Sequence, residues 1–131
     1  MSRTILTIFF FGLMLLVFKG TPGAQALWTA NGVPICTSGE DQRAPAIASD
    51  DSGGAIIVWQ DDRWGTADTD IFTQRIDASG QVKWAANGVS VSWPSGWQEA
   101  PEIIADGAGG AIIVWRDTRN GAGYDLSLIH I

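Results

Sequence analysis

The chain has 131 residues, a formal net charge of −6 and a single cysteine, and 46% of its residues are hydrophobic. Nucleic acids and anionic membrane surfaces attract basic patches, so this acidic composition argues against both as partners. Cys36 has no second cysteine with which to form a disulfide inside the chain.

The first 26 residues have the pattern of a secretory signal peptide. Arg3 gives a positive start, residues 4–18 form an apolar run, and Ala24-Gln25-Ala26 matches a small-residue cleavage site. A membrane-spanning helix needs about 20 apolar residues, so this run is short for one, although an uncleaved anchor is the alternative. We expect residues 1–26 to be removed, leaving a secreted or cell-surface protein without a membrane segment.

The remaining chain repeats itself with a period of about 56 residues. When residues 28–69 are aligned with residues 84–125, 20 of the 42 pairs are identical. The longest shared block, Gly-Gly-Ala-Ile-Ile-Val-Trp, occupies residues 53–59 and 109–115. A fixed period of this kind is typical of modular architectures. We therefore expect a first repeat unit at 27–83 and a second, truncated unit at 84–125.

Each unit is predicted to consist of short strands separated by turns. In chain order from residue 44, we expect a strand at 44–49, a Gly-Gly turn at 50–54, a strand at 55–60, an acidic loop at 61–69, a strand at 70–77 and the start of a fourth strand at 81–84. A further strand segment is expected at 89–93, past the start of the second unit. Pro45 fits a strand only near its start or at a sheet edge. No stretch after the signal peptide has sustained helical periodicity.

The strand at 55–60 is apolar on both faces. Ala55, Ile57 and Trp59 point to one side, and Ile56 and Val58 point to the other. A sheet with one solvated face would instead alternate apolar and polar residues. Four-stranded antiparallel blades stacked around an axis bury both faces in this way. The sequence therefore predicts an all-β chain of four-stranded units from a β-propeller.

Three stretches carry a resemblance to a family of bacterial secreted repeat proteins: Asp-Ile-Phe-Thr-Gln-Arg-Ile-Asp-Ala-Ser-Gly at 70–80, Trp-Ala-Ala-Asn-Gly-Val at 84–89, and residues 100–117 with their Gly-Gly-Ala-Ile-Ile-Val-Trp block. The resemblance covers nearly all of residues 27–125. It implies a large secreted or surface protein with a propeller region, whose remaining blades would be this chain's neighbours. Many such proteins end in a type IX secretion sorting domain, which is not visible here.

Tryptophans that occur in one unit alone are the candidate ligand-binding residues. Trp64, Trp93 and Trp97 have no tryptophan at the aligned position, whereas Trp59 and Trp115 repeat with the scaffold. Flat aromatic faces stack on sugars or on a partner's side chains. The alternative is that these rings pack against neighbouring loops.

Acidic residues crowd the loop at 61–69 and the start of the next strand. Asp61, Asp62, Asp68 and Asp70 supply the carboxylate oxygens that Ca²⁺ prefers, although no complete calcium-loop motif is present. These four residues are the candidate calcium site. The alternative is a solvated acidic loop in which Asp61 and Arg63 form a modest surface ion pair.

Residues 126–131, Leu-Ser-Leu-Ile-His-Ile, depart from the repeat. The hexapeptide is similar to the translated end of a sequencing adaptor, so we expect a non-native tail. The alternative is a divergent strand end, because its apolar alternation also suits a strand.

The leading functional expectation is a non-enzymatic repeat scaffold that binds protein or glycan through its loops. The alternative is a fragment of a propeller-type, sialidase-like glycosidase whose catalytic groups lie in other blades. Ser49–Gly53 resembles the start of a sialidase Asp-box, but Ile56 stands where that motif has its aromatic residue. No catalytic residue is assigned, and whether the whole protein is an enzyme stays open, with a scaffold preferred.

Overall fold

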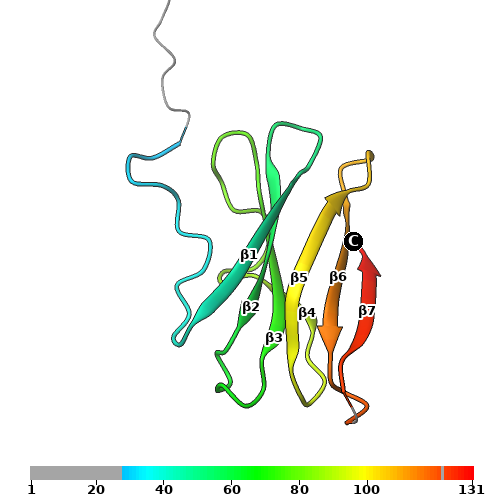
Figure 1. The fold of residues 1–131 in the computed structure, drawn as a ribbon. Coiled ribbons are helices and arrows are strands. Elements are labelled where there is room, and N and C mark those ends of the chain that lie inside the picture. The colour runs from blue at the N-terminus through cyan, green and yellow to red at the C-terminus, as the bar shows by residue number, and fades with distance from the viewer. Residues whose placement is uncertain (1–27, 122) are drawn as a thin grey trace, which may run out of the picture.

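The structure, a computed structural model, describes residues 28–121 and 123–131 (Figure 1). The predicted signal peptide lies outside the described residues. Two antiparallel sheets account for the regular structure of the described part: the first has the order β1 (Gln42–Ser49), β2 (Ala55–Asp61), β3 (Asp70–Ile76), β4 (Val89–Ser92), and the second has the order β5 (Gln98–Ala105), β6 (Ala111–Asp117), β7 (Asp125–His130). The predicted all-β class is therefore confirmed, and the two sheets do not close into a ring.

The predicted start of the fourth strand at 81–84 was wrong, whereas the predicted strand segment at 89–93 is confirmed as β4. Residues 81–84 make only one isolated bridge, between Val82 and Ile76, and the strand that completes the first sheet is β4. The buried side chain of Gln74 explains the shift, because its amide bonds the backbone of the intervening turn. Gln74 Nε2 donates to Ala85 O at 2.8 Å, and its Oε1 accepts from Trp84 N at 3.0 Å. The chain therefore bulges outward before it pairs again as β4.

The first strand of each sheet contains a β-bulge at the same place. The register between β1 and β2 shifts between Arg43 and Ala46, and that between β5 and β6 shifts between Glu99 and Glu102. Proline lacks an N–H donor, so it is tolerated at a bulge or in an edge strand. Both conditions hold for Pro45, since β1 is an edge strand of its sheet.

The Gly-Gly turn between β1 and β2 has a separate structural reason for each glycine. Gly53 has a φ of 84°, which side chains other than glycine's rarely adopt. A Cβ on Gly54 would collide with the carbonyl oxygen of Ile76 on the neighbouring strand. Asp50 Oδ1 holds the turn by accepting from the backbone N–H groups of Ser52 and Gly54, at 2.9 and 2.7 Å. This stretch is therefore a hairpin turn capped by Asp50, and the predicted Gly-Gly turn at 50–54 is confirmed.

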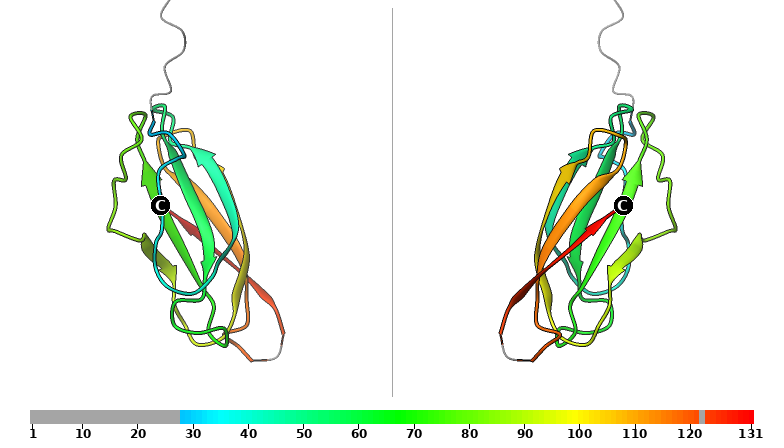
Figure 2. Two further views of the ribbon diagram at one scale, coloured as in Figure 1. Left: turned by 90° about the vertical axis from the view of Figure 1, so that its left-hand side faces the viewer. Right: turned by 90° about the vertical axis from the view of Figure 1, so that its right-hand side faces the viewer.

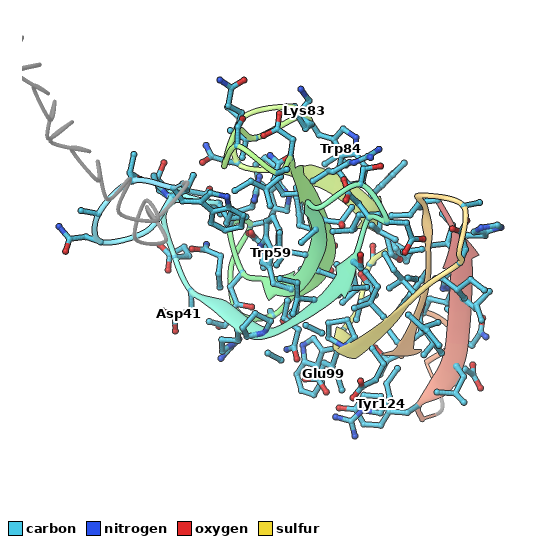
Figure 3. The ribbon with its side chains drawn as sticks, turned by 90° about the horizontal axis from the view of Figure 1, so that it is seen from above. Asp41, Trp59, Lys83, Trp84, Glu99 and Tyr124 are labelled. Atoms are coloured by element: carbon cyan, nitrogen blue, oxygen red, sulfur yellow. The ribbon has the colours of Figure 1, made fainter. Side chains whose placement is uncertain are left out.

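The two sheets stack face to face, with the core between them (Figures 2 and 3). Val58 and Ile71 of the first sheet pack against Ile113 and Trp115 of the second, and all four side chains are buried. The opposite face of β2 carries Trp59, which is 3% exposed and lies on the side turned away from the second sheet (Figure 3). The prediction that this strand is covered on both faces is confirmed at Val58 and Trp59, whereas Ile57, on the Trp59 face, is only half-buried.

Residues 126–131 lie in β7 and directly after it. Leu126 pairs with Arg116 and Leu128 with Val114, in the register that β3 adopts against β2. Strand pairing says nothing about the origin of the hexapeptide, so a non-native tail stays a prediction.

Candidate functional site

A Trp–Asp–Arg cluster with a buried aspartate lies at the end of the central strand of each sheet. In the first, Asp61 accepts from Trp59 Nε1 at 2.8 Å and from Arg63 Nε at 2.7 Å. Burial raises the pKa of Asp61, but the hydrogen bonds from Arg63 and Trp59 outweigh it and hold that pKa below its usual range. Because Asp61 is fully buried, the interpretation of Asp61 and Arg63 as a modest surface pair was wrong.

The same cluster recurs in the second sheet. Asp117 is fully buried and accepts from Trp115 Nε1 at 3.1 Å and from Arg119 Nε at 2.8 Å. The hydrogen bond from Arg119 holds the pKa of Asp117 well below its usual range. The sequence alignment contained this signal, since all three residues repeat, but the indole N–H was not recognised as the donor that brings the carboxylate inside.

The other three candidate calcium ligands have different surroundings. Asp62 is buried, forms an ion pair with Arg43 and accepts from Thr69 Oγ1 at 3.1 Å. Asp68 Oδ1 accepts from the backbone N–H of Gly96 at 2.9 Å. Asp70 is 3% exposed, and burial, followed by the nearby charges of Asp68 and Asp61, raises its pKa to about 6.

These carboxylates do not converge on one point. Within residues 28–121 and 123–131, no group of three or more His, Cys, Asp or Glu side chains is arranged to hold a metal ion. Calcium binding at Asp61, Asp62, Asp68 and Asp70 would require the hydrogen bonds of Asp61 and the ion pair of Asp62 to break. It stays a prediction of the sequence.

The three candidate tryptophans have different degrees of exposure. Trp64 and Trp93 are 72% and 73% exposed, whereas Trp97 is 45% exposed. Hydrogen bonds fix Trp97: its Nε1 donates to Ala67 O at 3.2 Å, and its backbone N–H donates to Thr118 Oγ1 at 2.7 Å. Trp97 therefore joins neighbouring loops while staying partly exposed, and Trp64 and Trp93 are largely exposed; ligand binding by any of the three stays a prediction.

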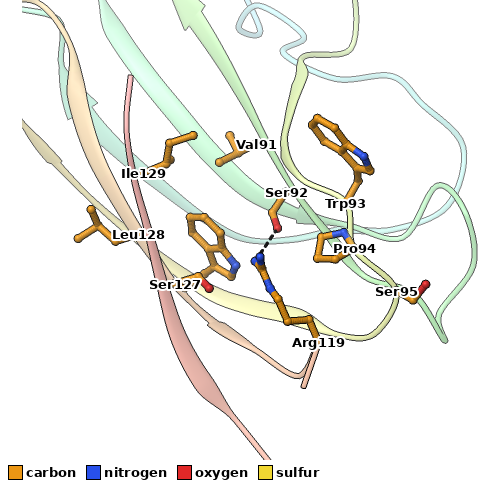
Figure 4. A pocket seen from close by; sticks show the side chains of 10 residues that line it. Val91, Ser92, Trp93, Pro94, Ser95, Arg119, Ser127, Leu128 and Ile129 are labelled. Carbon is orange, nitrogen blue, oxygen red and sulfur yellow. Dashed lines mark hydrogen bonds between the residues drawn. The ribbon is translucent and has the colours of Figure 1, made fainter. Parts of the chain in front are cut away.

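A pocket of about 590 Å³ opens beside Trp93 (Figure 4). Its rim comes from the loop after β4, and its floor comes from β6, β7 and the residue Arg119. Three hydroxyl groups, two indole rings and one guanidinium line it along with aliphatic side chains. The lining residues are Val91, Ser92, Trp93, Pro94, Ser95, Trp115, Arg119, Ser127, Leu128 and Ile129.

The pocket occupies the place that an aromatic ring fills in the first sheet. There, Phe72 lies 6.4 Å from Trp59 between ring centroids, and the Arg63 guanidinium lies 3.6 Å above the Phe72 ring. The corresponding position on β7 is Ser127, whose hydroxyl donates to Asp117 Oδ2 at 3.1 Å. A serine leaves the space beside Trp115 empty. The alignment of β7 with β3 indicates this pocket, because Ser127 stands where β3 has Phe72. The pattern of unrepeated tryptophans indicates only Trp93 among the lining residues.

Tyr124, the one tyrosine of the chain, pairs with an acid. Its hydroxyl donates to Glu99 Oε2 at 3.0 Å, and the two side chains lie next to each other in Figure 3. The Arg116 guanidinium lies 4.6 Å from the centre of the Tyr124 ring. The hydrogen bond to Glu99 raises the pKa of the Tyr124 phenol. The pair assigns no reaction by itself, because Tyr124 is 48% exposed and does not line the pocket beside Trp93.

Comparisons with protein-family models, with curated proteins and with solved structures found no match to this chain. In the described part of the chain, no helix has the length and apolar character that crossing a membrane requires.

Proposed function

We propose that this chain is part of a secreted or cell-surface β-propeller, a non-enzymatic repeat scaffold that binds glycans through the pocket beside Trp93. The observation that carries the proposal is the position of Trp93: an exposed, unrepeated indole at the rim of a pocket that also offers hydroxyls and Arg119. Indole faces stack on the apolar faces of sugar rings, while hydroxyl and guanidinium groups bond sugar oxygens. A protein ligand would use the same rim, with Trp93 as its central contact.

The propeller part of the proposal is supported by how the sheets stack. In the repeat, Ile113 and Trp115 of β6 correspond to Ile57 and Trp59 of β2. The β6 face that carries Ile113 and Trp115 packs against the other face of β2, the one that carries Val58. The sheets are therefore related head to tail, so the same contact can be repeated by further sheets, as in a ring of blades.

Soluble oligosaccharides test the binding site. Chitohexaose, cellohexaose and sialyllactose are titrated against the exported protein, and tryptophan fluorescence is followed. We expect Trp93→Ala to weaken binding about 5- to 10-fold, since an aromatic contact contributes on the order of 1–1.5 kcal/mol. Trp64→Ala is the matched control, because Trp64 is equally exposed and does not line the pocket.

Two outcomes contradict the proposal. Failure of all three sugars to bind at millimolar concentration overturns glycan binding by this pocket. Equal losses in Trp93→Ala and Trp64→Ala overturn the pocket as the site. Release of reducing sugar during the titration, measured on the same samples, would support the glycosidase alternative instead.

A further inference from the structure

The segment before β1 has the sequence and the turn of a fourth strand, but no strand partner in the described chain. Residues 30–33 are identical to residues 86–89, which lead into β4. Asn31 and Gly32 have φ values of 71° and 88°, close to the 64° and 86° of Asn87 and Gly88. Residues 33–36 nevertheless form no strand, whereas residues 89–92 pair with β3.

This segment already holds the position that a fourth strand of a preceding sheet would have. Arg63 Nη2 lies 3.6 Å from Cys36 Sγ, and Arg119 Nη2 makes the same contact with Ser92 Oγ at 3.4 Å. Ser92 belongs to β4 and so contacts the second sheet while it pairs with the first. Cys36 likewise contacts the arginine of the sheet that follows it, but it pairs with no strand of a preceding sheet in the described chain.

A second pair of backbone contacts confirms the equivalence. The N–H of Asp62 donates to Asp41 O at 3.0 Å, and the N–H of Thr118 donates to Trp97 O at 3.0 Å. Asp41 and Trp97 are aligned positions of the repeat, as are Asp62 and Thr118. Residues 33–41 therefore lie against the first sheet as residues 89–97 lie against the second.

The second sheet lacks what that segment would provide. It has three strands, and β7 is an edge strand with no partner beyond it in the described chain. The face that β6 turns away from the first sheet is open: Ile104 is 65% exposed and Leu128 64% exposed. On the first sheet the corresponding face is covered by the second sheet, and Ile56 and Val58 there are at most 1% exposed. Apolar faces of this kind mark interaction surfaces.

The opposite end of the molecule carries the complementary face. Ile47 is 66% exposed on β1, at the position aligned with Ile103. Ile103 packs into the core between the two sheets. The internal contact between the sheets is thus a template, and within the described residues one half of it is uncovered on each of the two sheets.

Building on the stacking proposed for the propeller, we propose that two copies of this chain associate head to tail through the same contact that a neighbouring blade would make, with residues 33–36 of one copy added to β7 of the other as the fourth strand of its second sheet. The Ile47 face of the first copy then covers the Ile104 face of the second. Pro34 stands at the position of Ser90, and an added outer strand is an edge, where proline is tolerated. A contact between two different surfaces leaves one of each free, so further copies can extend the assembly.

Complementary variants test the direction of the contact. Ile104→Lys blocks one surface and Ile47→Lys blocks the other, and both side chains are about two-thirds exposed, so each folded chain should survive. In sedimentation velocity of the exported protein, we expect concentration-dependent association of the unchanged chain and a monomer for each variant alone. An equimolar mixture of the two variants should form a 1:1 dimer, because one intact pair of surfaces remains. Thermal unfolding of each variant verifies its fold.

A cross-link tests the strand pairing itself. Ser92 is the Cα partner of Ile71, so Cys36 of one copy should lie opposite Leu126 of another, the residue aligned with Ile71. Opposed residues of antiparallel strands are separated by about 4.5–5.5 Å between Cα atoms, within disulfide range. We expect Leu126→Cys to form inter-chain disulfides with Cys36 when diamide takes up the two electrons and two protons released. Leu128→Cys, two residues further along the same strand, is the control and should not bond Cys36.

Four results would each overturn the proposal. The unchanged chain could stay monomeric at all concentrations. The mixture of Ile104→Lys and Ile47→Lys could fail to restore the dimer, or one variant alone could still dimerise, which would indicate a symmetric contact. Peptide mass spectrometry could find equal bonding of Cys36 in the Leu126→Cys and Leu128→Cys proteins, which would indicate random collision.

Discussion

The sequence Ala-Ile-Ile-Val-Trp forms a central strand twice, as β2 and as β6, in two different environments. In β2, both Ile56 and Val58 are at most 1% exposed because the second sheet covers them. In β6, the identical residues Ile112 and Val114 are only half-buried. The burial of a strand is therefore set by what stacks on it. An apolar face in sequence indicates only that the strand requires a cover.

The arginine that follows each central strand is also more exposed in the second sheet than in the first. The side chain of Arg63 is 13% exposed and that of Arg119 is 41% exposed, although both make the same bonds to a buried aspartate. Phe72 covers the first arginine, whereas Ser127 leaves the second beside an open pocket. The first sheet thus resembles the interior of an array, and the second resembles its end.

The largest expected difference between the sheets comes from placing a charge on each central strand. Val58→Asp puts a carboxylate into the core between the sheets, and we expect a loss of more than about 4 kcal/mol in the free energy of unfolding. Val114→Asp puts it on the open face, and we expect a loss of about 1 kcal/mol or less. Urea unfolding at low protein concentration measures both. Similar losses would show that the face of β6 is covered in solution.

A smaller difference should appear in the pH dependence of stability. The folded-state pKa of Asp70 is raised to about 6 from a usual 3.8, so the folded chain binds the extra proton. The contribution of Asp70 to the free energy of unfolding is therefore favourable at low pH and is lost as pH rises from about 4 to 6. By contrast, Asp106 has its pKa lowered to about 2 by the His130 hydrogen bond, and its contribution is lost as pH falls below about 4.

Asp70→Asn removes the group that loses stability at neutral pH. A shift of about two pKa units corresponds to about 3 kcal/mol, so we expect the variant to be about 2–3 kcal/mol more stable at pH 7 and nearly unchanged at pH 4. Asp125→Asn is the matched control, because Asp125 has the corresponding place in β7 and is exposed. Urea unfolding across pH 4–7 measures both variants. A gain at pH 4 as large as that at pH 7 would contradict the assignment.

Local features of the fold were predictable from the sequence because they depend on neighbouring residues. Strand positions follow from alternation and turn residues, and Pro45 indicated an edge. The fourth strand was misplaced because Gln74, ten residues away, fixes the chain outside the sheet. Periodicity contains no information about such a side-chain contact.

The candidate site was predictable only in part, for a related reason. The alignment of the two units distinguished the repeated tryptophans, Trp59 and Trp115, from the unrepeated Trp93, which lines the pocket. It also assigned Arg119 to the scaffold, although the absence of a phenylalanine at position 127 exposes that arginine to a ligand. A repeated residue can thus gain a surface role when the neighbour that covers it changes, and only the three-dimensional arrangement shows which neighbour that is.

The smallest expected effect comes from making the second sheet more like the first. Ser127→Phe would place a ring beside Trp115 and beneath Arg119, as Phe72 lies beside Trp59 and beneath Arg63. The new apolar and cation–π contacts should outweigh the lost hydrogen bond to Asp117, for a net gain of about 1 kcal/mol. Thermal unfolding measures this gain, and Ser90→Phe, outside the pocket, is the control. Because the ring fills the pocket, the same variant should also lose glycan binding. A more stable protein that still binds sugar would place the ligand site elsewhere, while a less stable one would show that the pocket cannot accept the ring.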